Sequence, residues 1–424
     1  MRGTSLRLLA VSLTLLAATA CMGDGGDSSS GNASIRLQVS GEREETAVYR
    51  AVVRAFEKDN PQIDVTLVEV ADKDDHLAKL ATAFSAGDPP DVFLVNFREY
   101  SQFVSRGAVA PFEDHLAAQE MDLADYYEEP IEAFTFDGAL QCMPQNISSL
   151  VVYFNTDLFE RAGVEPPFGG WTWDEFRDAA LELTTRDVRG VGIEPNVIRL
   201  APFMWSNGGE LVDDDTEPTR FTFDDPASRE ALEFVVSLVR DDEVVPSERE
   251  VAAQDLETRF TTGKIAMLLS SRRETPPFRE VTGLNFDVLP LPQAERPSGI
   301  LHSDGYCIAA QSDEQTAAAE LIAYATGEQG QTITTLGGRT VPSLESVANS
   351  LAFLDPLQAP AHSQVFLDGI PDLRRTPVIP TWPEIEDLAE EILTRAFYEP
   401  GYTIDDAIAA LEDQTSELFA EGGE

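Results

Sequence analysis

Residues 35–95 read IRLQVSGEREETAVYRAVVRAFEKDNPQIDVTLVEVADKDDHLAKLATAFSAGDPPDVFLV, and the spacing of their apolar residues switches between two periods. Alternation of apolar and polar residues is typical of a strand, and recurrence at every third or fourth position is typical of a helix. The pattern predicts strands at 35–39, 63–70 and 91–95, with helices at 48–56 and 77–84 between them. This order is typical of a parallel α/β sheet with right-handed crossovers.

The rest of the chain continues to mix strands and helices. Thr172-Trp-Asp-Glu175 has the pattern of a capping box, and Asp225-Pro226 is a second helix start. Further strands are predicted near 149–155, 264–269, 286–289 and 305–310, and further helices at 315–326, near 383–397 and around 404–418. With 424 residues, the chain is long enough for two domains.

The N-terminus has the features of a targeting segment. Arginines precede an uncharged apolar stretch at 8–20 that ends in small residues, which is typical of a secretory signal. Cys21 follows directly and resembles the acylated cysteine of the bacterial lipoprotein box. We therefore expect a signal peptide at 1–20, a lipid on Cys21 and a flexible Gly-, Asp- and Ser-rich tether over 21–34. An ordinary signal peptide with an incidental cysteine is the alternative.

Acidic residues dominate the charge of the chain. Asp and Glu number 75 against 30 Lys and Arg, which gives a formal net charge of −45. Such a surface repels phosphates, so nucleic acids and anionic lipid headgroups are not expected as partners. Because the acids are spread along the whole chain, we interpret them as a solvated surface and not as one acidic ligand site.

Sequence motifs for common chemistries are absent. The chain has no G-x-S-x-G, no C-x-x-C and no H-E-x-x-H, and Gly263-Lys264 lacks the following Ser or Thr of a P-loop. The four histidines are scattered along the chain. We therefore predict no catalytic residue, no metal site and no cofactor, and hence no enzyme.

Six segments carry a family resemblance. They span residues 56–65, 83–92, 150–159, 170–176, 260–267 and 341–343. In this order, and behind a lipoprotein-like signal, they resemble the extracellular solute-binding protein family 1, the relatives of maltose-binding protein. The resemblance covers nearly all of the mature chain.

The resemblance implies a type II periplasmic-binding-protein-like fold, in which two α/β lobes are joined by a hinge and enclose a ligand cleft. Lobe 1 would hold 35–143 plus 305–350, and lobe 2 would hold 144–304 plus 351–424. The lobes would close over a sugar or oligosaccharide and present it to an ABC permease with a separate ATPase. We expect a monomer that only its lipid anchor holds at the outer face of the bacterial cytoplasmic membrane.

Candidate ligand-binding residues follow from two arguments. Ligands of open α/β sheets lie beyond the carboxyl ends of the strands, and sugars need flat aromatic rings beside planar polar groups. The polar candidates at strand ends and chain crossings are Arg43, Glu44, Asn96, Asn146, Arg273 and Asp304. Trp205 and Trp382 lie where the resemblance implies cleft-lining or stacking aromatics. A position in the core for either tryptophan, or in a solvated loop for each polar residue, is the alternative.

The resemblance also implies a disulfide. Once Cys21 is acylated, Cys142 and Cys307 are the only cysteines left, in an oxidising compartment. By the topology of the family, they lie where the chain leaves lobe 1 and where it returns, so the bridge would tie the lobes at the pivot. Two buried free thiols are the alternative.

Other functions remain open at this point. Within the same architecture, the solute could be a polyamine, a glycerol phosphate ester or a peptide. A secreted glycosidase is a more remote alternative, since it needs a carboxylate pair at a fixed separation that sequence alone cannot show.

Overall fold

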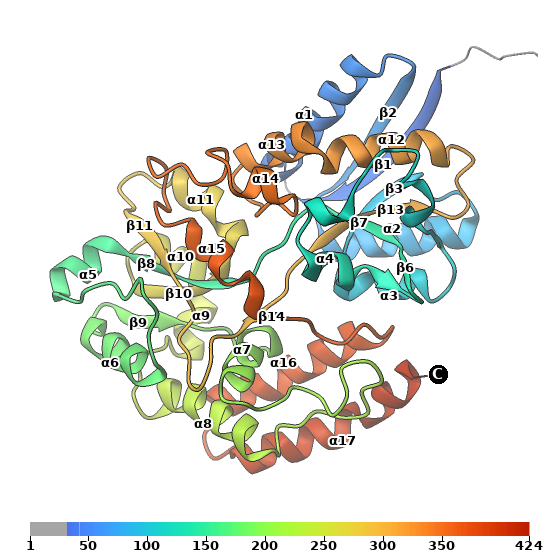
Figure 1. Ribbon diagram of the computed structural model, residues 1–424. Coiled ribbons are helices and arrows are strands. Elements are labelled where there is room, and N and C mark those ends of the chain that lie inside the picture. Colours follow the sequence, from blue (N-terminus) through green and yellow to red (C-terminus); the bar gives the residue numbers. More distant parts are fainter. Residues whose placement is uncertain (1–31, 42, 424) are drawn as a thin grey trace, which may run out of the picture.

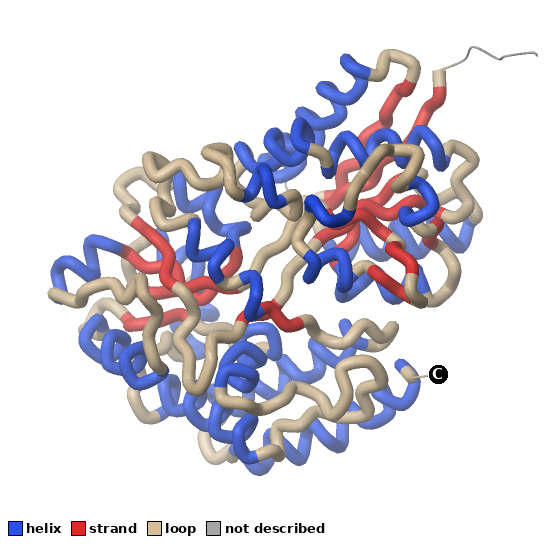
Figure 2. Tube along the Cα trace, in the orientation of Figure 1, coloured by secondary structure: helices blue, strands red, loops and turns tan. Residues whose placement is uncertain are grey.

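The computed structural model describes residues 32–41 and 43–423, without the side chains of Glu44 and Glu45. The chain forms two lobes, each built around one sheet, with connecting segments between them (Figures 1 and 2). The predicted signal peptide, Cys21 and most of the predicted tether lie outside the described residues. The first strand begins at Ala33, two residues earlier than the predicted start at Ile35, because Ala33 already pairs with Ile63.

The first lobe is built on a six-stranded mixed sheet, and its strands at 35–39, 63–70 and 91–95 confirm the prediction. The order is β2-β1-β3-β13-β4, with β7 paired to β13. β1 runs parallel to β2 and β3, whereas β13 runs antiparallel to β3. The strands are β1 (Ala33–Ser40), β2 (Ile63–Val70), β3 (Val92–Asn96), β4 (Val109–Ala110), β7 (Cys142–Pro144) and β13 (Asp304–Ala309), with a small hairpin of β5 (Thr135–Phe136) and β6 (Ala139–Leu140) beside them.

Helices cover both faces of the first sheet. The strand order 2-1-3 with parallel crossovers places α1 and α2 on opposite faces, as Figure 1 shows. Gly87 ends α2 in the left-handed conformation, with φ 73°, as the glycine in the sequence predicts. The helices of this lobe are α1 (Arg43–Asp59), α2 (Lys73–Ala86), α3 (Phe97–Val104), α4 (Glu128–Ala133), α12 (Gln315–Thr326) and α13 (Glu328–Leu336), with the 3-10 turns Phe112–His115 and Leu123–Asp125.

The second lobe is built on a four-stranded sheet of order β11-β8-β10-β9. Its strands are β8 (Leu150–Asn155), β9 (Arg189–Gly192), β10 (Ile265–Ser271) and β11 (Phe286–Leu289). Its helices are α5 (Thr156–Ala162), α6 (Trp173–Leu183), α7 (Val197–Ser206), α8 (Pro226–Arg240), α9 (Glu248–Ala253), α10 (Leu256–Thr261), α11 (Thr275–Glu280), α16 (Trp382–Tyr398) and α17 (Ile404–Gly422). The predicted capping box of Thr172 and Glu175 starts α6, which confirms that reading of the sequence.

Shorter elements lie near the border of the two lobes. They are the 3-10 turns Arg272–Glu274 and Ile370–Asp372, the helices α14 (Glu345–Ala348) and α15 (Gln364–Asp368), and the strand pair β12 (Gly299–Ile300) and β14 (Leu373–Arg374). None of the helices in the described part of the chain combines the length and the apolar character that crossing a bilayer requires.

Three chain segments run side by side between the lobes. Residues 145–149 leave the first lobe, 301–303 return to it, and 339–344 leave it again. The backbone of Ser148 exchanges two hydrogen bonds of 2.8 Å with His302, and the Ile147 amide donates to Val341 at 2.9 Å. These bonds make a short hinge of three segments that lie side by side.

The predicted disulfide between Cys142 and Cys307 is confirmed, with its α-carbons 4.4 Å apart. The two residues are directly paired neighbours on β7 and β13, so both belong to the sheet of the first lobe. The expected role at the pivot is therefore wrong, because the bridge joins two strands within one lobe and does not join the lobes. The two cysteines are 165 positions apart in the sequence, and the chain between them includes most of the second lobe.

Candidate functional site

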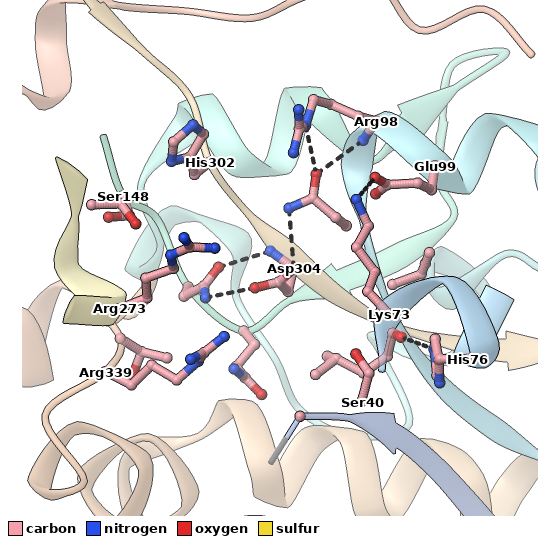
Figure 3. Close-up of a pocket in the computed structure, with 18 of the residues that line it drawn as sticks. Ser40, Lys73, His76, Arg98, Glu99, Ser148, Arg273, His302, Asp304 and Arg339 are labelled. Atoms are coloured by element: carbon pink, nitrogen blue, oxygen red, sulfur yellow. Dashed lines mark hydrogen bonds and ion pairs between the residues drawn. The ribbon is translucent and has the colours of Figure 1, made fainter. Parts of the chain in front are cut away.

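A cavity of about 560 Å³ lies where the lobes meet the hinge. The first lobe lines it from the carboxyl ends of β1 and β3 and from the starts of α2 and α3, as expected for a sheet of this type. The second lobe lines it from the start of α7, the end of β10 and one residue of α16. Figure 3 shows labelled side chains of the first lobe, such as Arg98, and Arg273 of the second lobe around the same space.

Asp304 is the centre of the hydrogen bonds in this cavity. One carboxylate oxygen accepts from the Asn96 side-chain amide and the other accepts from the Asn146 amide, each at 3.1 Å. The backbone amide of Asp304 donates in turn to the side-chain oxygen of Asn146 at 2.7 Å. Three residues from β3, β13 and the first crossing segment therefore hold one another in place (Figure 3).

An ion pair links the two lobes beside this centre. The side-chain oxygen of Asn96 caps α3 and accepts from the Nε of Arg98 at 3.3 Å. The Nη1 of Arg98 donates to Glu386 on α16 at 2.9 Å, and Glu386 also accepts from the indole Nε1 of Trp382 at 2.8 Å. Burial opposes the charge of Arg98, but Glu386 and Glu99 outweigh it and raise the pKa of the guanidinium.

The first lobe adds one more charged pair near the cavity wall, and the second lobe adds two. On the first lobe, Lys73 at the start of α2 forms an ion pair with the buried Glu99 of α3. On the second lobe, Arg199 of α7 contacts Glu194 at 2.6 Å. Arg273, directly after β10, donates through Nε to Glu274 at 2.7 Å, and its guanidinium points into the cavity (Figure 3).

His302 marks the point where the arginines converge. Burial lowers the pKa of this imidazole well below 6.5, and the positive charges of Arg98, Arg199 and Arg273 lower it further. These arginines come from both lobes, so the hinge histidine lies between them. It is neutral at physiological pH and can serve as a hydrogen-bond donor or acceptor.

Four of the eight predicted ligand-binding residues line this one cavity. They are Asn96, Asn146, Arg273 and Asp304. Their contact with a ligand stays a prediction. Arg43 does not line the cavity: it is exposed at the start of α1, and its carbonyl accepts from Arg50. The side chain of Glu44 lies outside what the structure describes.

The two tryptophans require a correction. Trp205 and Trp382 are only 1% and 0% exposed, and neither lines the cavity. Trp382 packs between Phe221 and Phe419 in the core of the second lobe, and Arg374 lies over the ring of Trp205 at 4.9 Å. The prediction that a sugar stacks on these rings is wrong for this conformation. Burying a large apolar ring in the core stabilises the folded protein more than leaving the ring exposed in a cleft.

Sequence reasoning missed several residues of the cavity wall. Among them are Lys73, Arg98, Glu99, Gln145, Arg199, His302 and Arg339. The sequence did contain a signal for two of them. Arg98 and Glu99 lie two and three residues after Asn96, at the carboxyl end of the predicted strand. No sequence signal marked Arg199 or Arg339, since only the tertiary structure brings the second lobe and the third crossing segment to this place.

The cavity wall is suited to hydrogen bonding rather than stacking. Its described lining offers guanidinium, ammonium and amide donors beside carboxylate and amide acceptors, with Tyr49 and two histidines as the only rings. Planar polar groups of this kind bind hydroxyl groups in a fixed geometry. The arrangement can therefore hold a small polar molecule between the lobes.

Comparison with solved structures places the fold. The chain is similar to an ABC substrate-binding protein of Listeria monocytogenes in complex with cycloalternan, with TM-score 0.83, 24% identity and coverage of 92% of this chain and 99% of that one. It is also similar to the sugar-binding protein MalE of Xanthomonas citri, with TM-score 0.80, 23% identity and coverage of 92% and 98%. These similarities confirm a two-lobed, maltose-binding-protein-like α/β fold.

Sequence comparison gives the same family. The chain is 26% identical over 402 residues to a binding protein of Brucella abortus, covering 90% of this chain and 93% of that protein. It is 25% identical over 329 residues to the diacetylchitobiose binding protein DasA of Streptomyces coelicolor, covering 74% and 73%. The family model described as bacterial extracellular solute-binding protein matches residues 51–361. The chain therefore belongs to the bacterial extracellular solute-binding proteins.

Proposed function

We propose that this chain captures a sugar or oligosaccharide between its lobes and delivers it to an ABC permease. The observation that carries the proposal is the cavity itself, because side chains from both lobes and from the hinge line one space of about 560 Å³. Ligand pockets commonly measure about 300–1,000 Å³. Rotation about the three crossing segments would close the lobes over the ligand.

Similar proteins support a carbohydrate as the ligand. Besides the diacetylchitobiose binding protein, the galactooligosaccharide-binding protein of Bacillus subtilis is 23% identical to this chain over 418 residues. A Thermotoga maritima protein of the same fold, with TM-score 0.77, was solved with maltose. The polar wall around Asp304 agrees with a molecule that carries many hydroxyl groups.

The proposal includes a binding role without catalysis and a lipid anchor on Cys21. The protein would then be a monomer that its acyl chains hold at the outer face of the cytoplasmic membrane. More than one acyl chain would be needed, because a single chain binds a membrane only weakly and reversibly. We expect Cys21→Ser to release the protein into the medium or to leave its precursor unprocessed. Membrane retention of a normally processed Cys21→Ser protein in cell fractionation would contradict the anchor.

Calorimetric titration tests the ligand class. The panel is maltose, maltotriose, diacetylchitobiose, galactobiose, glucuronic acid, sn-glycerol 3-phosphate, glycerophosphocholine and spermidine. We expect at least one saccharide to bind and to raise the melting temperature, because a ligand of the native state alone stabilises it. Binding of none of the saccharides, by calorimetry and by thermal shift, would refute the proposed sugar class.

Small-angle X-ray scattering tests the motion. A saturating concentration of the bound saccharide should reduce the radius of gyration, since closure brings the two sheets together about the hinge. The empty protein measured at the same concentration is the reference. Superimposable scattering curves for the two samples would argue against closure.

A phosphate ester is the second candidate. Five of the residues that line the cavity are basic, namely Lys73, Arg98, Arg199, Arg273 and Arg339, against four acidic ones, namely Glu99, Glu194, Asp304 and Glu390, although acids outnumber bases by 75 to 30 in the chain. The slight excess of positive charge in the wall, within a strongly acidic chain, favours an anionic over a cationic solute, and so speaks against a polyamine. A Mycobacterium tuberculosis protein of this fold, with TM-score 0.78, was solved with glycerophosphocholine. The two glycerol phosphates in the panel test this candidate.

A further inference from the structure

The first lobe contacts the second at a place outside the three crossing segments. α3 of the first lobe packs against α16 of the second, and residues 375–379, which lead into α16, contact α3 and α4 (Figure 1). Ile379 belongs to the apolar core of the second lobe, and Thr381 beside it donates to the Leu418 carbonyl of α17 at 2.8 Å. Contacts of α3 with this stretch and with α16 are therefore contacts between the lobes.

Two polar contacts join α3 to this part of the second lobe. The Nη1 of Arg98 donates to Glu386 Oε2 on α16 at 2.9 Å. One turn further along α3, the hydroxyl of Ser101 donates to the Ile379 carbonyl at 3.2 Å. The side chains of Arg98 and Glu386 are only 13% and 16% exposed, so water and salt screen this ion pair less than a pair on the surface.

Each partner of the ion pair is also held within its own lobe. On the first lobe, Asn96 Oδ1 accepts from the Nε of Arg98 at 3.3 Å. On the second lobe, the indole Nε1 of Trp382 donates to Glu386 Oε1 at 2.8 Å, which leaves Oε2 for Arg98. Because the Trp382 ring is fully buried, this bond fixes the direction of the carboxylate. Groups that are already held in the paired geometry lose less entropy when they meet than two mobile side chains do.

The boundary between α3 and α16 forms one side of the cavity. Arg98 on α3 and Glu390 on α16 line the cavity, and Glu390 lies one turn after Glu386. Glu386, Ser101 and Ile379 are not among the described residues that line it. The two polar contacts therefore lie beside the space for a ligand, and any movement that separates α3 from α16 has to break them.

We propose that the Arg98–Glu386 and Ser101–Ile379 contacts form an interlobe latch, which stabilises the closed form through groups outside the ligand's reach. The inference rests on the proposed closure and goes beyond it, because the latch acts in the empty protein as well. It raises the fraction of empty protein that is closed, and a ligand held by the closed form gains affinity with that fraction. It also slows dissociation, since a bound ligand leaves only after the latch has broken.

Glu386→Gln tests the latch without changing the cavity wall. The amide keeps the size of the side chain and an oxygen for Trp382, but it removes the charge that pairs with Arg98. In small-angle X-ray scattering, we expect the largest radius of gyration for the empty variant, a smaller one for the empty wild type and the smallest for the wild type saturated with its tightest-binding saccharide. Glu391→Gln is the matched control, because Glu391 is an exposed carboxylate on the same helix. Its radius should equal that of the wild type.

Dissociation rates measured by stopped flow distinguish a latch from a ligand contact. Each ligand of the panel that binds should leave Glu386→Gln about 10-fold faster than the wild type, because the variant loses a hydrogen bond between charged groups. The factor should be the same for all of these ligands, since the latch touches none of them. Ser101→Ala should accelerate dissociation by about 2- to 5-fold, because it removes a neutral hydrogen bond.

The melting temperature of each empty variant shows whether it is folded, and Ser101→Ala carries the test if Glu386→Gln does not fold. Equal radii of gyration for the empty wild type and the folded variants would overturn the latch. A factor that changes from ligand to ligand would overturn it too, and would assign Glu386 to ligand binding. The scattering of the empty proteins needs no ligand. A wild type that binds no saccharide would therefore overturn the proposed function, while scattering still decides on the latch.

Discussion

The two lobes differ in where they place their aromatic and polar side chains. All four tryptophans of the chain lie in the apolar core of the second lobe, and none lines the cavity. The first lobe has no tryptophan and contributes polar residues at the ends of β1 and β3. Tryptophan content thus indicates how the second lobe is packed, and the strand ends of the first lobe indicate where the site lies.

The lobes also differ in how their cavity residues are held. On the first lobe, hydrogen bonds among Asn96, Asn146 and Asp304 tie the wall to the hinge, and Cys307 of the disulfide follows Asp304 on β13. On the second lobe, the ion-pair partners of Arg199 and Arg273 among the described residues are carboxylates of their own lobe. The first lobe is therefore the preformed half of the site, and the second lobe brings cationic donors to it.

The largest effect is expected in the core of the second lobe. Trp382→Ala removes a fully buried ring between Phe221 and Phe419 and should lower the free energy of unfolding by roughly 3–5 kcal/mol. Urea denaturation measures the loss, and hydrogen exchange should locate it in the second lobe. Trp382→Phe, which keeps a ring, should lose less. A variant that keeps its stability but loses sugar affinity would restore the stacking role that the burial of Trp382 excludes.

The disulfide is the matching test of the first lobe. Replacing Cys142 and Cys307 together by alanine should cost about 2–4 kcal/mol, because the bridge closes a long loop in the unfolded chain. Faster hydrogen exchange should appear in β7 and β13 of the first lobe. Reductant should destabilise the wild type but not the double variant. Two free thiols in the denatured, unreduced wild type would show that the bridge does not form.

Local sequence signals located many of the strands and helices, whereas the arrangement in two lobes was expected only from the family resemblance. Period changes located the strands from Ile35 onward, and the capping box at Thr172 and the Gly87 terminator act where they were predicted. These signals work because the forces behind them act within a few residues. The polar candidates that line the cavity, such as Asn96 and Asp304, were found for the same reason, since strand ends are visible in the sequence.

The rest of the site depends on contacts between distant residues. A tryptophan in a loop-like sequence can line a cleft or fill a core, and nothing within a few residues of Trp382 decides between them. Arg199 reaches the cavity only because α7 of the second lobe faces the hinge. The pairing within the hinge likewise joins residues 145–149 to residues 339–344, which are far apart in the sequence.

An intermediate effect is expected at the junction of the lobes. Asp304→Asn replaces one carboxylate oxygen by an amide group, which then faces the donor amide of Asn96 or Asn146. Losing one charge-assisted hydrogen bond should lower the free energy of unfolding by about 1–3 kcal/mol and weaken ligand binding as well. Denaturation and calorimetry together measure both. Unchanged values in both experiments would show that Asp304 does not hold the hinge.

The smallest effect is a pH dependence that arises at the hinge. Burial, together with Arg98, Arg199 and Arg273, holds the pKa of His302 well below 6.5 in the folded protein. Above pH 6.5 the imidazole is neutral in both states, so the stability does not depend on its protonation. As the pH falls below 6.5, the unfolded chain binds a proton that the folded protein cannot accept, and the free energy of unfolding decreases.

His302→Gln removes this contribution, whereas the lowered pKa of the buried His76 acts in the same direction and remains in the variant. Urea denaturation at pH 7, 6 and 5 should therefore show a shallower loss of stability toward acid for His302→Gln than for the wild type. Equal slopes for the two proteins would show that the arginines of the two lobes do not keep the hinge histidine neutral.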